Sequence, residues 1–396
     1  MARILFTVPP LTGHLNPALA VADALSAQGH KVAWAVHARQ LRDKLPPRAC
    51  VYPLDAEDPV DSGIADPQVR GLESVRLFFE DYTLPIAERM LLPLEAIARS
   101  FQPDVMVVDH QLPGGALVAR KLGLPWATLI TTSASILKMS PMIDAWVENQ
   151  YLGLQRRYLP AELTVERPDF SPHLAVVFST ESLVGTTHER IAAPYAFVGP
   201  AKGDGRRAVA FPWDWLQPGS RKLLVSLGTV SRDRDTRFFE VMMAALAEMP
   251  DVQAVMVAPE SLAASAPPNV LVRDYVPQLE LLDCVHAVIC HGGHNTVCEA
   301  LSRGLPLIVA PIRDDQPVIA RQVIDAGAGL FMRHGKVTPA MAKTLITQLL
   351  GTSSLAENAR RLAEDLRAAP GAKGAAERIL QLAAQAAAKP ALRQVA

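Results

Sequence analysis

The sequence has almost no excess charge of either sign and no long hydrophobic run. It holds 39 lysines and arginines against 40 aspartates and glutamates, a formal net charge of −1. A nucleic-acid-binding protein needs a basic face, so this balance argues against a nucleic-acid partner. No uninterrupted apolar stretch approaches the roughly 18 residues of a membrane helix. The apolar N-terminal region is broken by Pro9, Pro10 and Gly13 and lacks the basic segment of a signal peptide. We therefore expect a cytoplasmic protein without integral membrane association.

Cysteine is also scarce. Four cysteines, at positions 50, 284, 290 and 298, form no C-x-x-C pair, and a reducing compartment would leave them as thiols. Cys290, His291, His294 and Cys298 nevertheless have the residue types of a zinc site. Because Cys290 is expected on a strand and Cys298 inside the following helix, we expect no shared tetrahedron. A G-x-G-x-x-G motif is missing, which argues against a dehydrogenase.

What the chain does contain is an alternation of strand-like apolar runs with helical patterns. This alternation is typical of parallel α/β folds, and 396 residues, of which 49% are hydrophobic, suit two domains. We expect a first domain at residues 1–200, a linker rich in glycine, proline and charge at 201–219, and a second domain at 220–373. The Ala-rich helix at 374–396 is expected to pack back on the first domain.

The most informative stretch runs from His291 to Gln316. An apolar run at 287–290 passes through Gly292 and Gly293 into a helical pattern, which predicts a strand, a glycine turn and a helix N-terminus. Unpaired N–H groups and the helix dipole make such a terminus a site for a diphosphate. His291 and Asn295 add donors, Glu299 can accept hydrogen bonds from ribose hydroxyls, and Asp315 with Gln316 suits the hydroxyls of a hexose.

A second constellation lies near the N-terminus. His14 follows a strand-like run at 3–8 and precedes a helical pattern at 15–26, so its imidazole would lie at a strand-to-helix junction and could act as a general base. Asp109 ends the apolar run 105–108 and reaches the same edge of a parallel sheet, where it could orient the imidazole. Asp104 is a rival partner, but it precedes its strand and would lie at the opposite edge.

These stretches resemble the UDP-glycosyltransferase superfamily, glycosyltransferase family 1, including bacterial natural-product and macrolide-type enzymes. The resemblance implies a GT-B fold, in which two Rossmann-like domains face each other across a cleft. Gly13-His14-Leu15-Asn16-Pro17 matches the family's G-H-x-x-P motif, which implies that His14 is the catalytic base and Asp109 its partner.

The resemblance also implies a donor site in the second domain. His291 would contact the β-phosphate and Asn295 and Thr296 the diphosphate, while Tyr275 would stack on the base. His294 stands where plant members have a tryptophan. The full set of donor-binding residues that the resemblance implies is Ser226, Gly228, Thr229, Tyr275, Val276, Gln278, His291, Gly293, His294, Asn295, Thr296, Glu299, Asp315 and Gln316.

Neither a metal nor a cofactor is expected. Asp233-Arg234-Asp235 resembles the Asp-x-Asp metal clamp of the other main glycosyltransferase fold, but a solvated loop is the simpler interpretation. The helix terminus and His291 can already offset the diphosphate charge. The nucleotide sugar would be a co-substrate.

Aromatic and methionine side chains in two segments of the first domain, 62–93 and 133–169, are the candidates for an acceptor site, with plain core as the alternative. They are Phe78, Phe79, Tyr82, Met139, Met142 and Trp146. If they line a cleft, they favour a flat hydrophobic aglycone such as an aromatic polyketide, alkaloid, flavonoid or macrolide. A lipid acceptor at a membrane surface is a further alternative.

The sequence thus predicts an inverting, metal-independent glycosyltransferase that moves a hexose from a UDP- or dTDP-sugar to a small hydrophobic acceptor. A nucleotide-sugar epimerase of the same architecture and a non-catalytic auxiliary protein are the alternatives. Either a monomer or a homodimer fits the sequence.

Overall fold

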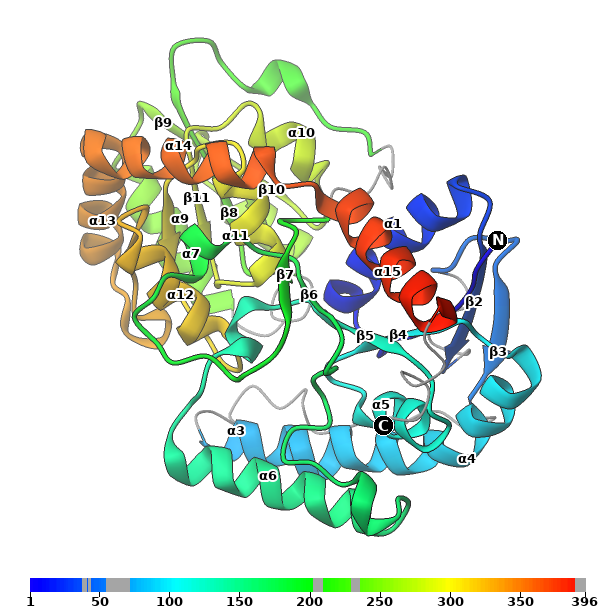
Figure 1. Cartoon of the computed structure of the whole chain (residues 1–396). Helices are drawn as coiled ribbons and strands as arrows, with labels where there is room; N and C mark the ends of the chain where they lie inside the picture. The colour runs from blue at the N-terminus through cyan, green and yellow to red at the C-terminus, as the bar shows by residue number, and fades with distance from the viewer. Residues whose placement is uncertain (38–40, 42–43, 55–71, 202–208, 229–235, 389–396) are drawn as a thin grey trace.

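The computed structural model of the chain contains two parallel α/β domains side by side (Figure 1). It describes residues 1–37, 41, 44–54, 72–201, 209–228 and 236–388. The expected fold class is confirmed. In the described part, no helix has both the length and the apolar character needed to span a membrane.

The first domain is built on a seven-stranded sheet in the order β3-β2-β1-β4-β5-β6-β7, and every neighbouring pair is parallel. Strands β4 and β5 are buried throughout, which explains their continuous apolar sequence. The strands are β1 (Arg3–Thr7), β2 (Lys31–Val36), β3 (Cys50–Pro53), β4 (Val105–Asp109), β5 (Trp126–Ile130), β6 (Ala175–Val177) and β7 (Tyr195–Phe197).

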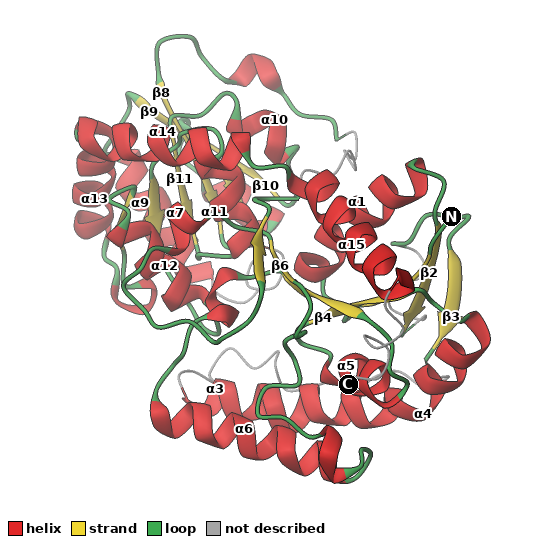
Figure 2. Cartoon of the chain, viewed as in Figure 1, coloured by secondary structure: helices red, strands yellow, loops and turns green. Residues whose placement is uncertain are grey.

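Helices cover both faces of this sheet (Figure 2). The α-helices are α1 (Thr12–Ala27), α3 (Leu72–Leu77), α4 (Leu84–Phe101), α5 (Pro113–Lys121), α6 (Pro141–Arg156) and α7 (Glu181–Val184). A π-helical turn, η2 (Phe78–Thr83), joins α3 to α4, and short 3₁₀ turns are η3 (Ser133–Ile136) and η4 (Ala161–Leu163).

The second domain repeats this plan with a six-stranded parallel sheet in the order β10-β9-β8-β11-β12-β13. Its strands are β8 (Arg221–Ser226), β9 (Val252–Val257), β10 (Val270–Arg273), β11 (Ala287–Cys290), β12 (Leu307–Val309) and β13 (Gly329–Phe331). Its helices are α9 (Thr236–Ala247), α10 (Gln278–Leu282), α11 (His294–Leu301), α12 (Gln316–Asp325), α13 (Pro339–Gly351) and α14 (Ser353–Ala368), with 3₁₀ turns η5 (Trp213–Trp215), η6 (Glu260–Ser265) and η7 (His334–Lys336).

The last helix, α15 (Gly371–Ala388), leaves the second domain and lies beside α1 of the first (Figure 1). Ala375, Ala376 and Ile379 are buried in the core that also contains Val21 and Leu25 of α1. The chain therefore crosses between the domains twice, and the first domain's core is completed by the C-terminal helix.

Each sheet reverses its strand order at its middle. In the first sheet β1 lies between β2 and β4, and in the second β8 lies between β9 and β11. Ligands of open α/β sheets bind outside the carboxyl ends of the strands at such a switch point. The loops after β1, β4, β8 and β11 are therefore the expected places for a site.

Candidate active site

The first half of the site forms at the switch point of the first sheet. Thr7 of β1 pairs with Val108 of β4, so the two strands end at the same level. The chain turns after β1 and enters α1, which places His14 in the first helical turn. His14 Nδ1 lies 2.8 Å from Asp109 Oδ2, and Asp109 is fully buried. Because an ionised carboxylate can only accept, the proton of His14 belongs on Nδ1, and Nε2 keeps its lone pair.

Neighbouring groups keep Asp109 ionised. Its burial opposes ionisation, but His14, His110 and the backbone N–H of Gln111 together hold the pKa of this carboxyl below its ordinary value. The rival Asp104 lies at the amino end of β4, where it accepts a hydrogen bond of 2.8 Å from the Arg3 backbone N–H. It cannot reach His14 from that edge.

Two partners of this pair were missed from the sequence. The hydroxyl of Thr131 lies 2.7 Å from His14 Nδ1. The second is His110, which directly follows Asp109 in the chain. Its Nε2 atom lies 2.7 Å from the Ser135 hydroxyl, and its Nδ1 atom lies 3.2 Å from the Leu129 carbonyl. The available signal was the hydroxyl-rich stretch at 131–135, which directly follows the buried strand β5.

Among the described residues, His14, Asp109 and His110 form the one group of three with metal-type ligand atoms, all within 4.8 Å of one another. The Nδ1 atoms of both histidines and both carboxylate oxygens of Asp109 already have hydrogen-bond partners in the protein. Cys290 and Cys298, considered above for zinc, are buried; Cys298 Sγ lies 3.5 Å from His294 Nε2.

The second half of the site forms at the switch point of the second sheet. Cys290 of β11 pairs with Ser226 of β8 and with Val309 of β12. The three strands therefore end at one edge of the sheet, and the loops that follow them begin there. Gly293 is the N-cap of α11, and the free N–H groups of its first turn face this edge. A helix terminus of this kind can bind a diphosphate.

Glycines surround the His291 ring closely. A Cβ at Gly228 or at Gly293 would lie 2.7 Å from the Cε1 atom of His291, which no side chain tolerates. Gly228 also has a φ of 72°, a backbone conformation that favours glycine. The two glycines therefore fix the position of the imidazole beside the helix terminus.

The His291 imidazole is neutral at pH 7. Burial lowers its pKa to about 4, against the opposing effects of Asp315 and the Ser226 backbone. Its Nδ1 atom is buried without a hydrogen-bond partner in the described structure. An unpaired buried nitrogen beside a helix N-terminus is suited to a ligand that completes its hydrogen bonding.

On the predicted ribose side, Gln278 Nε2 donates to Glu299 Oε2 at 2.6 Å. Burial raises the pKa of Glu299, and Gln278 and Arg303 act in the opposite direction. Tyr275 is 50% exposed in the loop before α10, whereas Val276 is buried. An exposed ring at this position is available for stacking.

The loop that follows β12 is held by hydrogen bonds that the sequence did not reveal. Gln316 Oε1 accepts from the backbone N–H groups of Ile312 and Arg313, at 2.8 and 3.2 Å. Asp314 has a φ of 55° and accepts a hydrogen bond of 2.7 Å from Ser74. The side-chain oxygen of Gln316 is thus used to hold the loop that precedes α12. The side-chain amide nitrogen is the part suited to a sugar hydroxyl.

The two halves touch across the domain boundary. Asn295 Nδ2 donates to the Gly13 carbonyl at 3.2 Å, which brings α11 against the first turn of α1, where His14 lies. His294 is buried at the same boundary, with Nε2 3.0 Å from the Phe178 carbonyl of the first domain. Thr296 lies in the same first turn of α11 and is partly exposed.

The acceptor candidates divide into two groups. The ring centroids of Phe78 and Tyr82 lie 5.6 Å apart, and so do those of Phe79 and Trp146. Because Phe78 and Phe79 also pack against each other, the four rings form one cluster. Tyr82 is 5% exposed, and its hydroxyl has no hydrogen-bond partner among the described groups. Met139 lies just before α6 and Met142 in its first turn, and their side chains are 51% and 70% exposed. Side chains this exposed to solvent do not line an enclosed apolar cleft.

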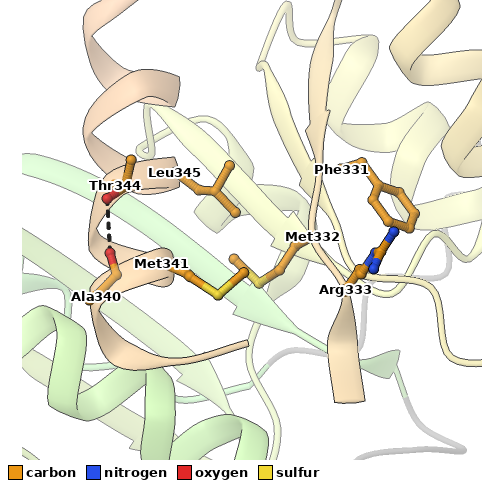
Figure 3. Close-up of a pocket in the computed structure, with 7 residues that line it drawn as sticks. All are labelled: Phe331, Met332, Arg333, Ala340, Met341, Thr344 and Leu345. Atoms are coloured by element: carbon orange, nitrogen blue, oxygen red, sulfur yellow. Dashed lines mark hydrogen bonds between the residues drawn. The ribbon is translucent and has the colours of Figure 1, made fainter. Parts of the chain in front are cut away.

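Several predicted features lie wholly or partly outside the described residues: Thr229, the Asp233-Arg234-Asp235 triplet, residues 62–71 of the first acceptor segment, residues 202–208 of the linker, and residues 389–396 of the C-terminal helix. A shallow apolar pocket lies between the edge strand β13, two strands away from β11, and α13 (Figure 3). None of the predicted site residues lines it.

Comparison with known proteins relates the chain to glycosyltransferases. Residues 240–382 match the family described as erythromycin biosynthesis protein CIII-like, C-terminal domain. The uncharacterized UDP-glucosyltransferase YojK of Bacillus subtilis is 27% identical over 97% of this chain and 98% of its own length. The demethyllactenocin mycarosyltransferase of Streptomyces fradiae is 27% identical over 98% of this chain and 88% of its own.

A solved structure shares the fold. The glycosyltransferase VinC, in complex with dTDP, superimposes with a TM-score of 0.74 at 20% identity and covers 97% of this chain and 100% of its own. Residues 240–382 thus match the EryCIII-like C-terminal domain family, and the chain has the GT-B fold and is similar over nearly its whole length to glycosyltransferases of natural-product biosynthesis.

Proposed function

We propose that this enzyme is an inverting, metal-independent glycosyltransferase that moves a hexose from a UDP- or dTDP-sugar to a small hydrophobic acceptor. The observation that carries this proposal is the His14–Asp109 pair at 2.8 Å, because Gly13, the residue before His14, contacts Asn295 at the N-terminus of α11. The proposed base and the proposed diphosphate site therefore lie on adjoining helix ends.

In this mechanism His14 Nε2 takes the proton of the acceptor hydroxyl while its oxygen attacks the anomeric carbon. The bond from that carbon to the nucleoside diphosphate breaks on the opposite face, and the leaving group carries away the electron pair. An α-linked donor therefore yields a β-glycoside. The N–H groups of α11 and the His291 imidazole stabilise the departing charge.

The relatives support both nucleotides. YojK carries the name of a UDP-glucosyltransferase, and VinC was solved with dTDP. The aromatic cluster of Phe78, Phe79, Tyr82 and Trp146 favours a flat hydrophobic aglycone such as an aromatic polyketide, alkaloid, flavonoid or macrolide.

The first test is thermal stabilisation by UDP, dTDP and NAD, because a ligand that binds only the native state raises the unfolding midpoint. We expect a shift with UDP or dTDP and none with NAD. The matching glucose donor is then incubated with 7-hydroxy-4-methylcoumarin, with and without EDTA, and the anomeric configuration of the product is read by NMR. A shift with NAD alone, an α-glycoside, or complete inhibition by EDTA would contradict the proposal, and conversion of the donor without acceptor would indicate an epimerase.

A further inference from the structure

Five consecutive residues after β5, Thr131 to Ser135, connect the two halves of the site. The hydroxyl of Thr131 lies 2.7 Å from His14 Nδ1 in the first domain. The hydroxyl of the next residue, Thr132, donates to Asp315 Oδ2 of the second domain at 2.5 Å. Adjacent residues of one segment thus hold the proposed base on one side and the loop after β12 on the other.

The backbone explains why neighbours reach in different directions. Thr132 is extended, with φ −134° and ψ 129°, and successive side chains of extended backbone point to opposite sides. Thr131, Thr132 and Ser133 are all buried, so their hydroxyls need partners and are confined to the ones they have. The segment is therefore held by hydrogen bonds on both sides.

Ser133 and Ser135 extend the same connection. The Ser133 hydroxyl lies 2.7 Å from Gln322 Oε1 on α12 and 3.4 Å from His294 Nδ1 on α11, both in the second domain. The Ser135 hydroxyl lies 2.7 Å from His110 Nε2 in the first domain. Every described hydroxyl in the segment thus contacts one of the two halves of the site.

The proton count decides what Thr131 does. Nδ1 of His14 has one hydrogen, and two oxygens lie within 2.8 Å of it, from Asp109 and from Thr131. Both contacts are favourable together only if the nitrogen carries the hydrogen and both oxygens accept a share of it. Thr131 therefore supports the same tautomer as Asp109, the one that leaves Nε2 free to accept a proton.

We propose that Thr131 and Thr132 form a coupling segment in which Thr131 positions His14 and Thr132 ties that position to the Asp315 loop of the donor domain. The base is then fully aligned when the two domains are in the arrangement that holds the donor. Both are positioning residues, since they act through His14 and Asp315. The inference rests on the proposed function of His14 as the base.

The test is a double-mutant cycle on transfer of glucose from the nucleotide donor to 7-hydroxy-4-methylcoumarin. Thr131→Val should lower kcat about tenfold with the donor KM within about twofold, and Thr131→Ser should restore most of kcat. Thr132→Val should raise the donor KM and also lower kcat several-fold, because Thr131 loses its anchor. The fold reduction in kcat of the double variant should be smaller than the product of the fold reductions of the two single variants.

The exposed Thr344→Val, on α13, is the matched control and should match the wild type. The coupling is refuted if Thr132→Val changes the donor KM alone or if the two kcat losses simply multiply. Wild-type kcat in Thr131→Val would remove the positioning role.

A measurement without substrate separates this inference from the proposed function. In ¹⁵N-histidine NMR, the His14 signals are identified by their loss in His14→Ala. We expect Thr131→Val and Thr132→Val each to move the Nδ1 signal of His14, and Thr344→Val to leave it in place. An unmoved signal in Thr132→Val would overturn the coupling even if His14 proved essential, whereas an active His14→Ala enzyme would overturn the base assignment first.

Discussion

At the scale of single residues, the two halves of the site are positioned by different means. His14 is held by hydrogen bonds to Asp109 and Thr131. His291 is held by packing between Gly228 and Gly293, with a polar atom left unpaired. A base needs a defined tautomer, whereas a phosphate-binding ring needs an open hydrogen-bonding position, so the two environments match the two proposed tasks.

Removing the base should stop chemistry and spare binding. We expect His14→Ala to reduce transfer by roughly 10²-fold or more, with the thermal shift produced by UDP or dTDP unchanged. Asp109→Asn should act in the same direction with a smaller loss, since the imidazole remains. Steady-state kinetics beside thermal shifts measure both effects, and near-wild-type turnover in His14→Ala would remove the base assignment.

Displacing the His291 ring should do the reverse. Gly293 has an ordinary φ of −61°, so an alanine there meets no backbone penalty, only the ring at 2.7 Å. We expect Gly293→Ala to raise the Kd for UDP or dTDP at least about tenfold in calorimetry, an effect of about 1.4 kcal/mol. Gly153→Ala on α6, where a Cβ would meet nothing within 4 Å, is the control. Equal affinity in both variants would mean that His291 does not contact the diphosphate.

At the scale of elements, the C-terminal helix α15 is a structural part of the first domain. Its alanines allow a close approach to α1, and Ile379 fills the core between them. The helix follows the second domain along the chain, but its buried side chains lie in the core of the first domain.

The core contribution of α15 can be measured directly. Ile379 is fully buried, so Ile379→Ala should lower the free energy of unfolding by about 2–5 kcal/mol, from lost burial and the cavity left behind. Glu377→Ala, at an exposed position of the same helix, should change it by less than about 0.5 kcal/mol. Urea unfolding followed by circular dichroism gives both values. Equal stability of the two variants would show that α15 does not pack on the first domain in solution.

At the scale of the whole molecule, three histidines lie in the two halves of the site, and His294 among them contacts both domains. Burial lowers the pKa of His110, His291 and His294, with partial compensation from Asp109, Asp315 or backbone carbonyls. Hydrogen bonds from Ser74, Thr132 and Asn295 cross the same boundary. The junction is therefore polar but adapted to neutral imidazoles.

This arrangement predicts acid sensitivity. A histidine with a lowered folded pKa binds fewer protons in the native state than in the unfolded state, so stability is lost as the pH falls below the unfolded value of 6.5. For His291, whose folded pKa is about 4, the loss between pH 6.5 and 4 is up to about 3 kcal/mol. Thermal unfolding from pH 8 to pH 4.5 should show a falling midpoint, and His291→Gln should flatten the curve. An identical slope in that variant would contradict the assignment to His291.

Sequence alone determined the fold class, the strand-loop-helix units and the placement of His14, Asp109 and the helix at 294–301 near sheet edges. These features follow from local patterns: buried parallel strands are continuous apolar runs, and glycine turns mark the helix starts that follow. The edge at which a side chain lies follows from whether it precedes or follows its strand, which is why Asp104 could be set aside.

Tertiary structure decided everything that depends on residues far apart in the chain. The Thr131–His14 contact spans 117 positions and the Thr132–Asp315 contact 183. Hydroxyls carry no periodic signal, so their partners become visible only when two strand ends meet. The capping role of Gln316 and the exposure of Met139 and Met142 were decided in the same way, because loop conformation and solvent exposure follow from packing rather than from residue type.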